Sequence, residues 1–176
     1  MFKTRIIKNW LPKDLHEYLV NYFSYGVPHH FGHGSVQHPE LSDKYQFYNH
    51  YFMGNPLVDY LKFKILTEFN SKIEILRSYI NVQHQNMESI FHKDDGNVTI
   101  LYMVCGEGNF QIINDYEVTG ENKFSMGKIN PKDMEDIEFE NNKLIIFDAQ
   151  RPHRGNPPEK GMRITLAFKT NWITNE

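Results

Sequence analysis

The spacing of hydrophobic residues in this 176-residue chain changes near residue 70, and this change limits the folds that the chain can adopt. Before that point, hydrophobic residues recur every three or four positions, as in helices that bury one face. Between residues 72 and 170 they alternate in short runs bounded by Gly, Asn, Asp and Pro, which is typical of strands joined by turns. Helices followed by strands without a helical crossover predict an α+β, mainly β fold with an antiparallel sandwich or jelly roll.

Two helices are expected in the first third of the chain. One spans Pro12 to Tyr25, with proline in its first turn, and the other begins at Asn55-Pro56, a capping residue followed by proline. The segment from Gly26 to His50 combines glycine, histidine, proline and aromatic residues without a period, which predicts a long loop. Strands are expected at Lys72–Gln83, Glu88–His92, Val98–Cys105, Phe110–Ile113, Met134–Phe139, Lys143–Phe147 and Met162–Thr170.

Length, charge and cysteine content limit the class of protein. The length favours one domain over residues 1–176, with helical support at about 1–70 and a β core at about 71–176. The formal net charge of -3 leaves no basic excess, so no nucleic acid partner is expected. The longest apolar stretch, Ile100–Cys105, is too short to cross a membrane, and Met1–Trp10 lacks the apolar core of a signal peptide. With Cys105 as the single cysteine, these features predict a cytoplasmic protein and leave its oligomeric state open.

Three residues have the types and the spacing of a metal site. In His92-Lys93-Asp94, residues two apart on a strand point to one face, so an imidazole and a carboxylate enter the same space. His153 follows another expected strand and supplies a second imidazole. Two histidines and one carboxylate form the facial triad of non-haem Fe(II) sites, which leaves coordination positions open. By itself the spacing is equally compatible with a polar strand end beside a turn.

An arginine ten residues after His153 changes this balance. Arg163 lies in an otherwise apolar strand, where burying a guanidinium is costly unless it binds an anion. Its planar fork suits a carboxylate, and Thr165, two residues further on the same face, adds a hydroxyl donor. Alone, this arginine is equally compatible with a surface position or an internal ion pair. Together with the two histidines and Asp94, it favours a site that holds a metal and a carboxylate.

In their order and strand context, these residues resemble those of the Fe(II)- and 2-oxoglutarate-dependent oxygenases. The resemblance is closest to the small single-domain members related to prolyl 4-hydroxylases, of bacterial and phage type. A departure lies at Gly106–Phe110, where many relatives carry a Gly-Gly-Glu-Thr-like stretch, so the local turn and substrate contacts there differ. The segments that carry the resemblance are Arg77–Asn81, His92–Asp94, Val98–Tyr102, Leu144–Asp148, Arg151–Gly155 and Arg163–Thr165.

The resemblance implies a double-stranded β-helix (jelly-roll) core with supporting N-terminal helices. It implies that His92, Asp94 and His153 ligate Fe(II), with 2-oxoglutarate and O2 as cosubstrates. Arg163, helped by Thr165, would bind the distal carboxylate of 2-oxoglutarate. The implied activity is hydroxylation of a small-molecule or peptide substrate, with a prolyl residue as the first expectation. Further candidate contacts to the cosubstrate are Tyr79, Tyr102 and Asn81.

Two other functions stay open on the same fold. A cupin-like metalloprotein would use different chemistry, but it does not require an arginine ten residues after the last ligand, as Arg163 is here. A catalytically silent binding module would keep the barrel without the iron, which the intact set of candidate ligands argues against. Both alternatives predict no response to 2-oxoglutarate.

The remaining histidines fall into two groups. Four crowd the expected loop, where neighbouring aromatic residues favour a substrate lid over a second metal site, and a plain surface loop is the simplest alternative. Three others are expected to be structural. The loop group is His29, His30, His33 and His38, and the structural group is His16, His50 and His84.

Overall fold

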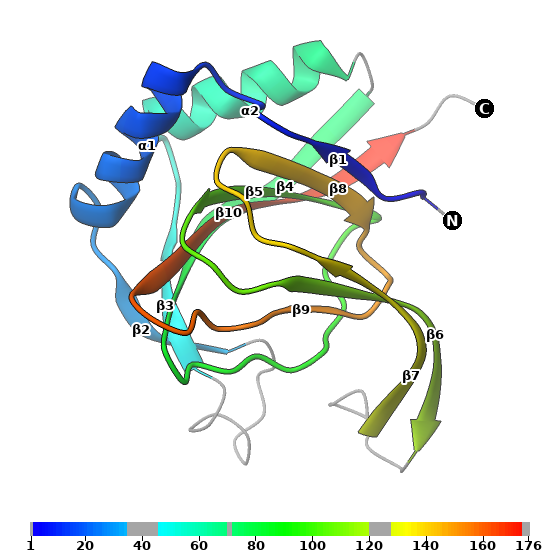
Figure 1. Cartoon of the computed structure of the whole chain (residues 1–176). Helices are drawn as coiled ribbons and strands as arrows, with labels where there is room; N and C mark the ends of the chain where they lie inside the picture. The colour runs from blue at the N-terminus through cyan, green and yellow to red at the C-terminus, as the bar shows by residue number, and fades with distance from the viewer. Residues whose placement is uncertain (1, 35–45, 70–71, 120–127, 174–176) are drawn as a thin grey trace.

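Two antiparallel sheets and two helices make up the fold of the computed structural model, which describes residues 2–34, 46–69, 72–119 and 128–173 (Figure 1). The large sheet contains, in spatial order, β1 (Arg5–Ile7), β8 (Lys143–Asp148), β5 (Val98–Cys105), β10 (Met162–Ile173), β4 (Lys72–His84), β3 (Gln46–Tyr51) and β2 (His30–Gly34). The small sheet contains β7 (Lys128–Ile137), β6 (Phe110–Thr119) and β9 (His153–Gly155). The expected mainly β, jelly-roll architecture is confirmed.

Both helices lie on one side of the large sheet, as Figure 1 shows, and both begin where the sequence predicts. Helix α1 covers Lys13–Tyr25 directly after Pro12, and helix α2 covers Pro56–Glu68. The Asn55 side chain caps α2 by accepting hydrogen bonds from the backbone amides of Leu57 and Val58. The helices bury their apolar faces against the sheet, so they close its outer side.

The large sheet buries both of its faces, and alternation along each strand separates two hydrophobic clusters. On β5, Ile100, Tyr102 and Val104 join the cluster under the helices. Leu101 and Met103 point the other way, into the cluster between the two sheets. A residue's parity on these strands therefore decides whether it faces the helices or the space between the sheets.

Two predictions are wrong, one for the segment before β4 and one for the segment after it. The segment Gly26–His50 is not a loop throughout, because β2 and β3 lie in it and extend the large sheet beside β4. Strand β2 has a bulge after Phe31 and a positive φ at Gly32, which removed the regular alternation that would have marked a strand. Segment Glu88–His92 is not a strand either, since only His92 pairs, through one isolated bridge.

The helical support expected at about 1–70 also contributes strands. β1 pairs with β8, and β2 and β3 complete the opposite edge of the same sheet. Strand β7 ends at Ile137, before the expected end at Phe139, and lies at the edge of the small sheet. The acidic residues Asp133, Glu135 and Asp136 therefore lie on an edge strand.

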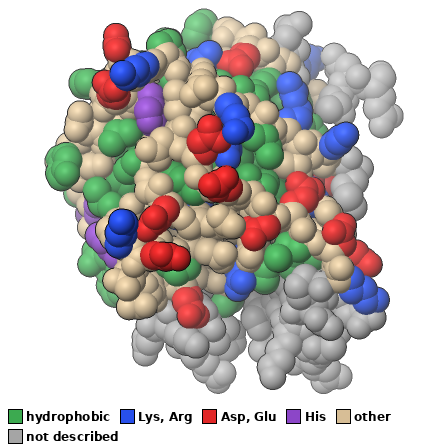
Figure 2. Space-filling view, viewed as in Figure 1, with side chains coloured by type: hydrophobic (Ala, Val, Ile, Leu, Met, Phe, Trp, Pro, Cys, Tyr) green, Lys and Arg blue, Asp and Glu red, His purple; other side chains and the backbone are tan. Residues whose placement is uncertain are grey.

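The surface carries charges of both signs. On the face in Figure 2, Asp and Glu side chains lie among Lys and Arg side chains instead of leaving a basic patch. Within the described residues, no helix is both long and apolar enough to cross a membrane.

A buried asparagine connects the start of α1 to the large sheet. Asn142, at φ 64°, accepts a hydrogen bond from the Leu11 amide at 2.9 Å and donates to the Leu11 carbonyl at 2.8 Å. It also accepts from the Tyr102 hydroxyl at 3.2 Å, and the His16 imidazole contacts that hydroxyl at 2.6 Å. This confirms the structural role expected of His16.

We expect Asn142→Ala to lower the free energy of unfolding by about 3 kcal/mol, because two buried backbone groups of Leu11 lose their partners. Urea unfolding measures the change. Asn141→Ala, at the exposed neighbouring position, is the matched control and should change stability little. Equal stability of the two variants would contradict this role for the asparagine.

Candidate metal and cosubstrate site

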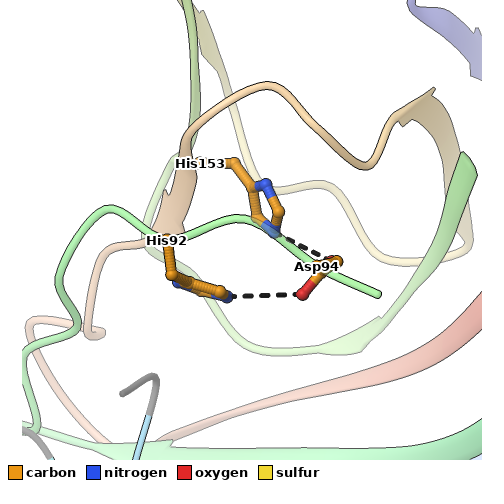
Figure 3. A group of neighbouring side chains, drawn as sticks. All are labelled: His92, Asp94 and His153. Atoms are coloured by element: carbon orange, nitrogen blue, oxygen red, sulfur yellow. Dashed lines mark ion pairs between the residues drawn. The ribbon is translucent and has the colours of Figure 1, made fainter. Parts of the chain in front are cut away.

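The two histidines and the aspartate predicted from the sequence meet in one cluster. Figure 3 shows both imidazoles pointing toward the Asp94 carboxylate. The His153 Nε2 atom lies 3.0 Å from Asp94 Oδ2, and His92 Nε2 lies 3.7 Å from Asp94 Oδ1. One potential ligand atom from each residue lies within 4.8 Å of the others. Among the described residues this is the group of His, Cys, Asp or Glu side chains that could hold a metal ion.

An isolated backbone bridge, in place of the strand expected at Glu88–His92, brings these residues together. His92 and His153 form an isolated antiparallel bridge, with reciprocal N–H to C=O hydrogen bonds of 3.1 and 3.0 Å. The Asp94 amide donates to the Ala149 carbonyl at 2.9 Å, which fixes the chain after the bridge. The expected proximity of the three side chains is confirmed, although the strand invoked to explain it is absent.

Hydrogen bonds orient each imidazole for metal binding. The Nδ1 atom of His92 lies 3.0 Å from the Ile90 carbonyl, and Nδ1 of His153 lies 2.8 Å from the Arg151 carbonyl. A carbonyl accepts only from a protonated nitrogen, so each Nδ1 carries a hydrogen and Nε2 is left as the atom of each ring that faces the cluster. Metal-binding histidines are commonly oriented by such a second hydrogen bond.

Electrostatics keep the cluster in the protonation state that a cation needs. Burial, with the nearby His153, lowers the pKa of His92 to about 4, so this imidazole is neutral near pH 7. Burial alone would raise the pKa of the Asp94 carboxyl, but Lys169 and His153 hold it well below its ordinary value. His92 thus presents a neutral nitrogen donor and Asp94 an ionised carboxylate, and this combination suits a divalent first-row transition metal.

The cluster opens into a cavity of about 380 Å³ between the two sheets. Strands β4 and β10 form its floor, and they are paired so that matching residues face the cavity two by two. The cross-strand pairs that line it are Gln83 with Arg163, Asn81 with Thr165, Tyr79 with Ala167, and Arg77 with Lys169. Alternation along the strands therefore places a row of polar side chains on a face that is otherwise part of a core.

Arg163 lies at one end of this row and is 3% exposed. Its Nη1 donates to Gln83 Oε1 at 2.5 Å, while Nε and Nη2 have no hydrogen-bond partner among the described residues. Burial lowers the pKa of Arg163 to about 10, which leaves the guanidinium charged near pH 7. Buried donors without partners are costly, so this end of the cavity is suited to an anionic ligand.

Gln83 and Gly155 hold this guanidinium in place. The Gln83 Nε2 atom donates to the carbonyls of Met87 and Gly155 at 3.0 and 3.2 Å, so its Oε1 is presented to Arg163. Gly155 is packed directly beneath the arginine, since a Cβ there would lie 2.4 Å from Arg163 Nη1.

We expect Gly155→Ala to raise the KM for 2-oxoglutarate about 10- to 100-fold by displacing the guanidinium. Steady-state succinate formation at varied 2-oxoglutarate measures this effect. Glu159→Ala, at an exposed position of the same β9–β10 connection, is the control and should leave KM unchanged. An unchanged KM in Gly155→Ala would argue against binding of the cosubstrate at Arg163.

The other predicted cosubstrate contacts divide between the two faces of the sheet. Thr165 and Tyr79 are buried and line the cavity, and Asn81 lines it with its Oδ1 lacking a partner among the described residues. Tyr102 does not line the cavity. It lies in the cluster under the helices and its hydroxyl contacts His16 and Asn142, so the expectation for Tyr102 is corrected. The sequence does not show which face of the sheet an aromatic residue on a core strand occupies unless the strand register is known.

Sequence reasoning missed Lys169. This lysine is 3% exposed, its ammonium donates to Asp94 Oδ2, and it lies over the Tyr79 ring at 5.5 Å. Burial alone would lower the pKa of Lys169, but the Asp94 carboxylate and the Tyr79 hydroxyl raise it above the ordinary value. The signal was available, because Lys169 has the same parity on its strand as Arg163 and Thr165.

The histidines of the expected loop lie elsewhere in the described structure. His29 Nε2 contacts the Phe23 carbonyl at 2.8 Å, and His30 stacks on His50 at 5.7 Å. His38 lies outside the described residues, and so does the side chain of His33. Tyr51 at the end of β3 lines the cavity, and the role of this segment as a lid stays a prediction.

Comparison with known proteins gives matches at the level of structure. No protein-family model matches the sequence, and no curated protein matches it. HygX from Streptomyces hygroscopicus, with nickel and 2-oxoglutarate bound, matches with a TM-score of 0.65 and 11% identity, over 96% of this chain and 82% of that one. A prolyl-4-hydroxylase from Pseudomonas putida matches with a TM-score of 0.65 and 13% identity, over 98% and 92% of the two chains.

A Trichoplax adhaerens prolyl hydroxylase, in complex with a peptide of hypoxia inducible factor, matches with a TM-score of 0.65 and 16% identity, over 96% of this chain and 82% of that one. The fold is that of the 2-oxoglutarate–Fe(II) oxygenases. The jelly-roll core expected from the resemblance is thereby confirmed.

The residues present fit a metal ion and 2-oxoglutarate, the two groups bound in the HygX structure. For a metal, His92, Asp94 and His153 offer two nitrogen donors and one oxygen donor in a buried cluster. For 2-oxoglutarate, the cavity joins that cluster to Nε and Nη2 of Arg163, which have no partner in the part of the chain that the structure describes. A dicarboxylate that spans the cavity would satisfy both ends.

Proposed function

We propose that this protein is an Fe(II)- and 2-oxoglutarate-dependent dioxygenase that hydroxylates an organic substrate. The observation that carries the proposal is the pairing, in one cavity, of the His92–Asp94–His153 cluster with the buried Arg163, whose Nε and Nη2 have no partner among the described residues. A metal site alone would not require the arginine, and an arginine site alone would not require the cluster.

In this proposal each residue has a defined task. His92, Asp94 and His153 would hold the iron, which supplies the activation of O2 when bound. Arg163 would bind the distal carboxylate of 2-oxoglutarate through its two remaining donors, and Thr165 would add a hydroxyl donor. Gln83 orients the arginine, so the cosubstrate is held in a fixed position relative to the cluster.

Aromatic side chains from both sheets lie against the cluster. The rings of Phe110 and Phe147 lie 5.7 and 4.7 Å from the His153 imidazole, and both line the cavity. These rings would keep bulk water from the reacting atoms, which strengthens electrostatic interactions there.

The test is anaerobic titration of the purified protein with Fe(II) and then 2-oxoglutarate. A chelated keto acid is expected to give a weak visible charge-transfer absorption, and exposure to O2 should then release succinate. A cupin-like enzyme of different chemistry, or a silent binding module, would show neither signal, and that result would overturn the proposal.

The proposed hydroxylation is compatible with more than one class of substrate. A prolyl residue of a peptide or protein is the first candidate, and the similar structures include a prolyl hydroxylase bound to a peptide and HygX with hygromycin B bound. A succinate-release screen against peptide and metabolite pools, with mass spectrometry for a gain of one oxygen, identifies the substrate. We place the reaction in the cytoplasm, where ferrous iron and the free thiol of Cys105 stay reduced.

A further inference from the structure

One buried charge in the cavity is not explained by the metal or by the cosubstrate. Lys169 lies within the floor of the cavity, is 3% exposed and has the Asp94 carboxylate as its anionic partner. Its neighbours on the cavity side are the Tyr79 ring and the Thr99 hydroxyl, which itself donates to Asp94 at 2.7 Å. In the structure described here, the lysine and the aspartate neutralise each other.

Binding of the metal and of 2-oxoglutarate, on which the proposed function rests, changes the charge balance between Lys169 and Asp94. A divalent metal and Arg163 bring three positive charges, and Asp94 with the 2-oxoglutarate dianion brings three negative charges. The positive and negative charges of these groups are equal in number, so the loaded metal site is electrically neutral without a lysine. Lys169 then adds one positive charge that has no counter-ion inside the cavity.

Other charged groups of the cavity do not supply that counter-ion. Arg77 and Asp95 pair with each other at 2.7 Å, and their side chains are 39% and 67% exposed at the mouth. Lys93 is exposed and has the same sign as Lys169. Among the described lining residues, Asp94 and Asp95 are the acidic ones, and both are already committed.

An uncompensated charge in a buried cavity is strongly unfavourable, and a ligand with the opposite charge removes this cost. Lys169 lies six residues from Arg163 on β10, which places their backbones about 20 Å apart along an extended strand. Because the distal carboxylate of 2-oxoglutarate would be paired with Arg163, it does not supply a counter-ion for Lys169. The missing anion has to enter with a further ligand.

We propose that the substrate carries a carboxylate that binds the Lys169 ammonium beside the metal cluster. The substrate class is therefore a carboxylic acid, either a free amino acid or related small acid, or an acidic side chain in a peptide. The hydroxylated carbon lies close to that carboxylate, because Lys169 contacts the ligand residue Asp94 directly.

The first test uses acetate and its neutral isostere acetamide as probes. The protein is loaded anaerobically with Fe(II) and saturating 2-oxoglutarate, and the visible absorption is followed as each probe is added. Acetate should shift the absorption saturably, while acetamide should not. Lys169→Met should weaken the acetate response at least about 30-fold, as expected when one partner of a buried charge pair is removed.

Controls separate this inference from the proposed function. Lys13→Met, which removes a lysine with an 84% exposed side chain at the start of α1, should respond to acetate as the native protein does. Absence of the visible absorption on loading would overturn the proposed function itself. A normal absorption with no acetate response, or an equal response in Lys169→Met, would overturn the anionic substrate alone.

The same variant distinguishes a role toward the cosubstrate. Calorimetry with Mn(II) should give similar 2-oxoglutarate affinities for the native protein and Lys169→Met. A loss as large as that of Arg163→Leu would assign Lys169 to 2-oxoglutarate and overturn the inference.

The second test identifies the source of the carboxylate. Succinate release is compared for amino acids against their carboxamides, and for peptides with Asp or Glu against the same peptides with Asn or Gln. We expect turnover with acids in one of these series, with a loss of at least about 30-fold for the neutral partner. Lys169→Gln should reduce that preference to near unity, and equal turnover of acids and amides by the native protein would contradict the proposal.

Discussion

Asp94→Ala is expected to abolish the iron-dependent conversion of 2-oxoglutarate to succinate. The change removes the only anionic donor of the cluster, so we expect the affinity for Mn(II) or Co(II) to fall at least about 100-fold. It also leaves Lys169 buried without its partner, which should lower the free energy of unfolding of the metal-free protein by about 3–5 kcal/mol. Calorimetric metal titration, succinate release and urea unfolding measure the three effects.

A double variant separates the loss of a metal ligand from the loss of stability. Asp94→Ala combined with Lys169→Met removes both buried charges, so stability should largely recover while metal binding stays weak. Asp94→Asn keeps the size of the side chain and removes the charge, and it should also bind metal poorly. Turnover at the native rate in Asp94→Ala would remove this residue from the ligand set.

Arg163→Leu is expected to raise the KM for 2-oxoglutarate by at least about 100-fold, because truncating one partner of a buried charge pair costs about 2–5 kcal/mol. Metal affinity in the absence of 2-oxoglutarate should stay close to the native value, since Arg163 does not belong to the ligand cluster. Succinate formation at varied 2-oxoglutarate, together with calorimetry in the presence of Mn(II), measures both quantities.

Arg163→Lys tests whether charge or geometry matters more at this position. A lysine keeps the positive charge but lacks the planar fork, so its KM should lie between those of the native protein and Arg163→Leu. A native KM in Arg163→Leu would mean that the cosubstrate carboxylate binds elsewhere in the cavity.

The contrast between Tyr79 and Tyr102 shows where sequence reasoning reached its limit. Both are aromatic residues on core strands, and both were expected near the cosubstrate. Parity on β4 and β5, combined with the stacking order of the sheets, turns Tyr79 into the cavity and Tyr102 toward α1. Because this sheet is buried on both faces, hydropathy alone does not distinguish its two sides.

Strands β2 and β3 were missed for a related reason. Strand β3 pairs with β4 and β2 pairs with β3 at the edge of the sheet, and the bulge after Phe31 interrupts the alternation that would mark β2 as a strand. Their pairing depends on a partner that comes about 30 residues later in the chain, a long-range interaction that local propensity does not encode. The two helices, in contrast, were predicted to within one residue at their starts, because Pro12 and Asn55-Pro56 act locally.

The sequence by itself determined the residue types of the site, the change from helical to strand spacing, and the short-range placement of Arg163 beside Thr165. These features depend on chemistry and on neighbours within a few residues. The tertiary structure decided that His92 and His153 meet through a single bridge, and that Asp94 is shared between this cluster and Lys169. Those contacts join residues 61 and 75 positions apart, so they exist only when the sheets have closed and the register of β4, β5 and β10 is fixed.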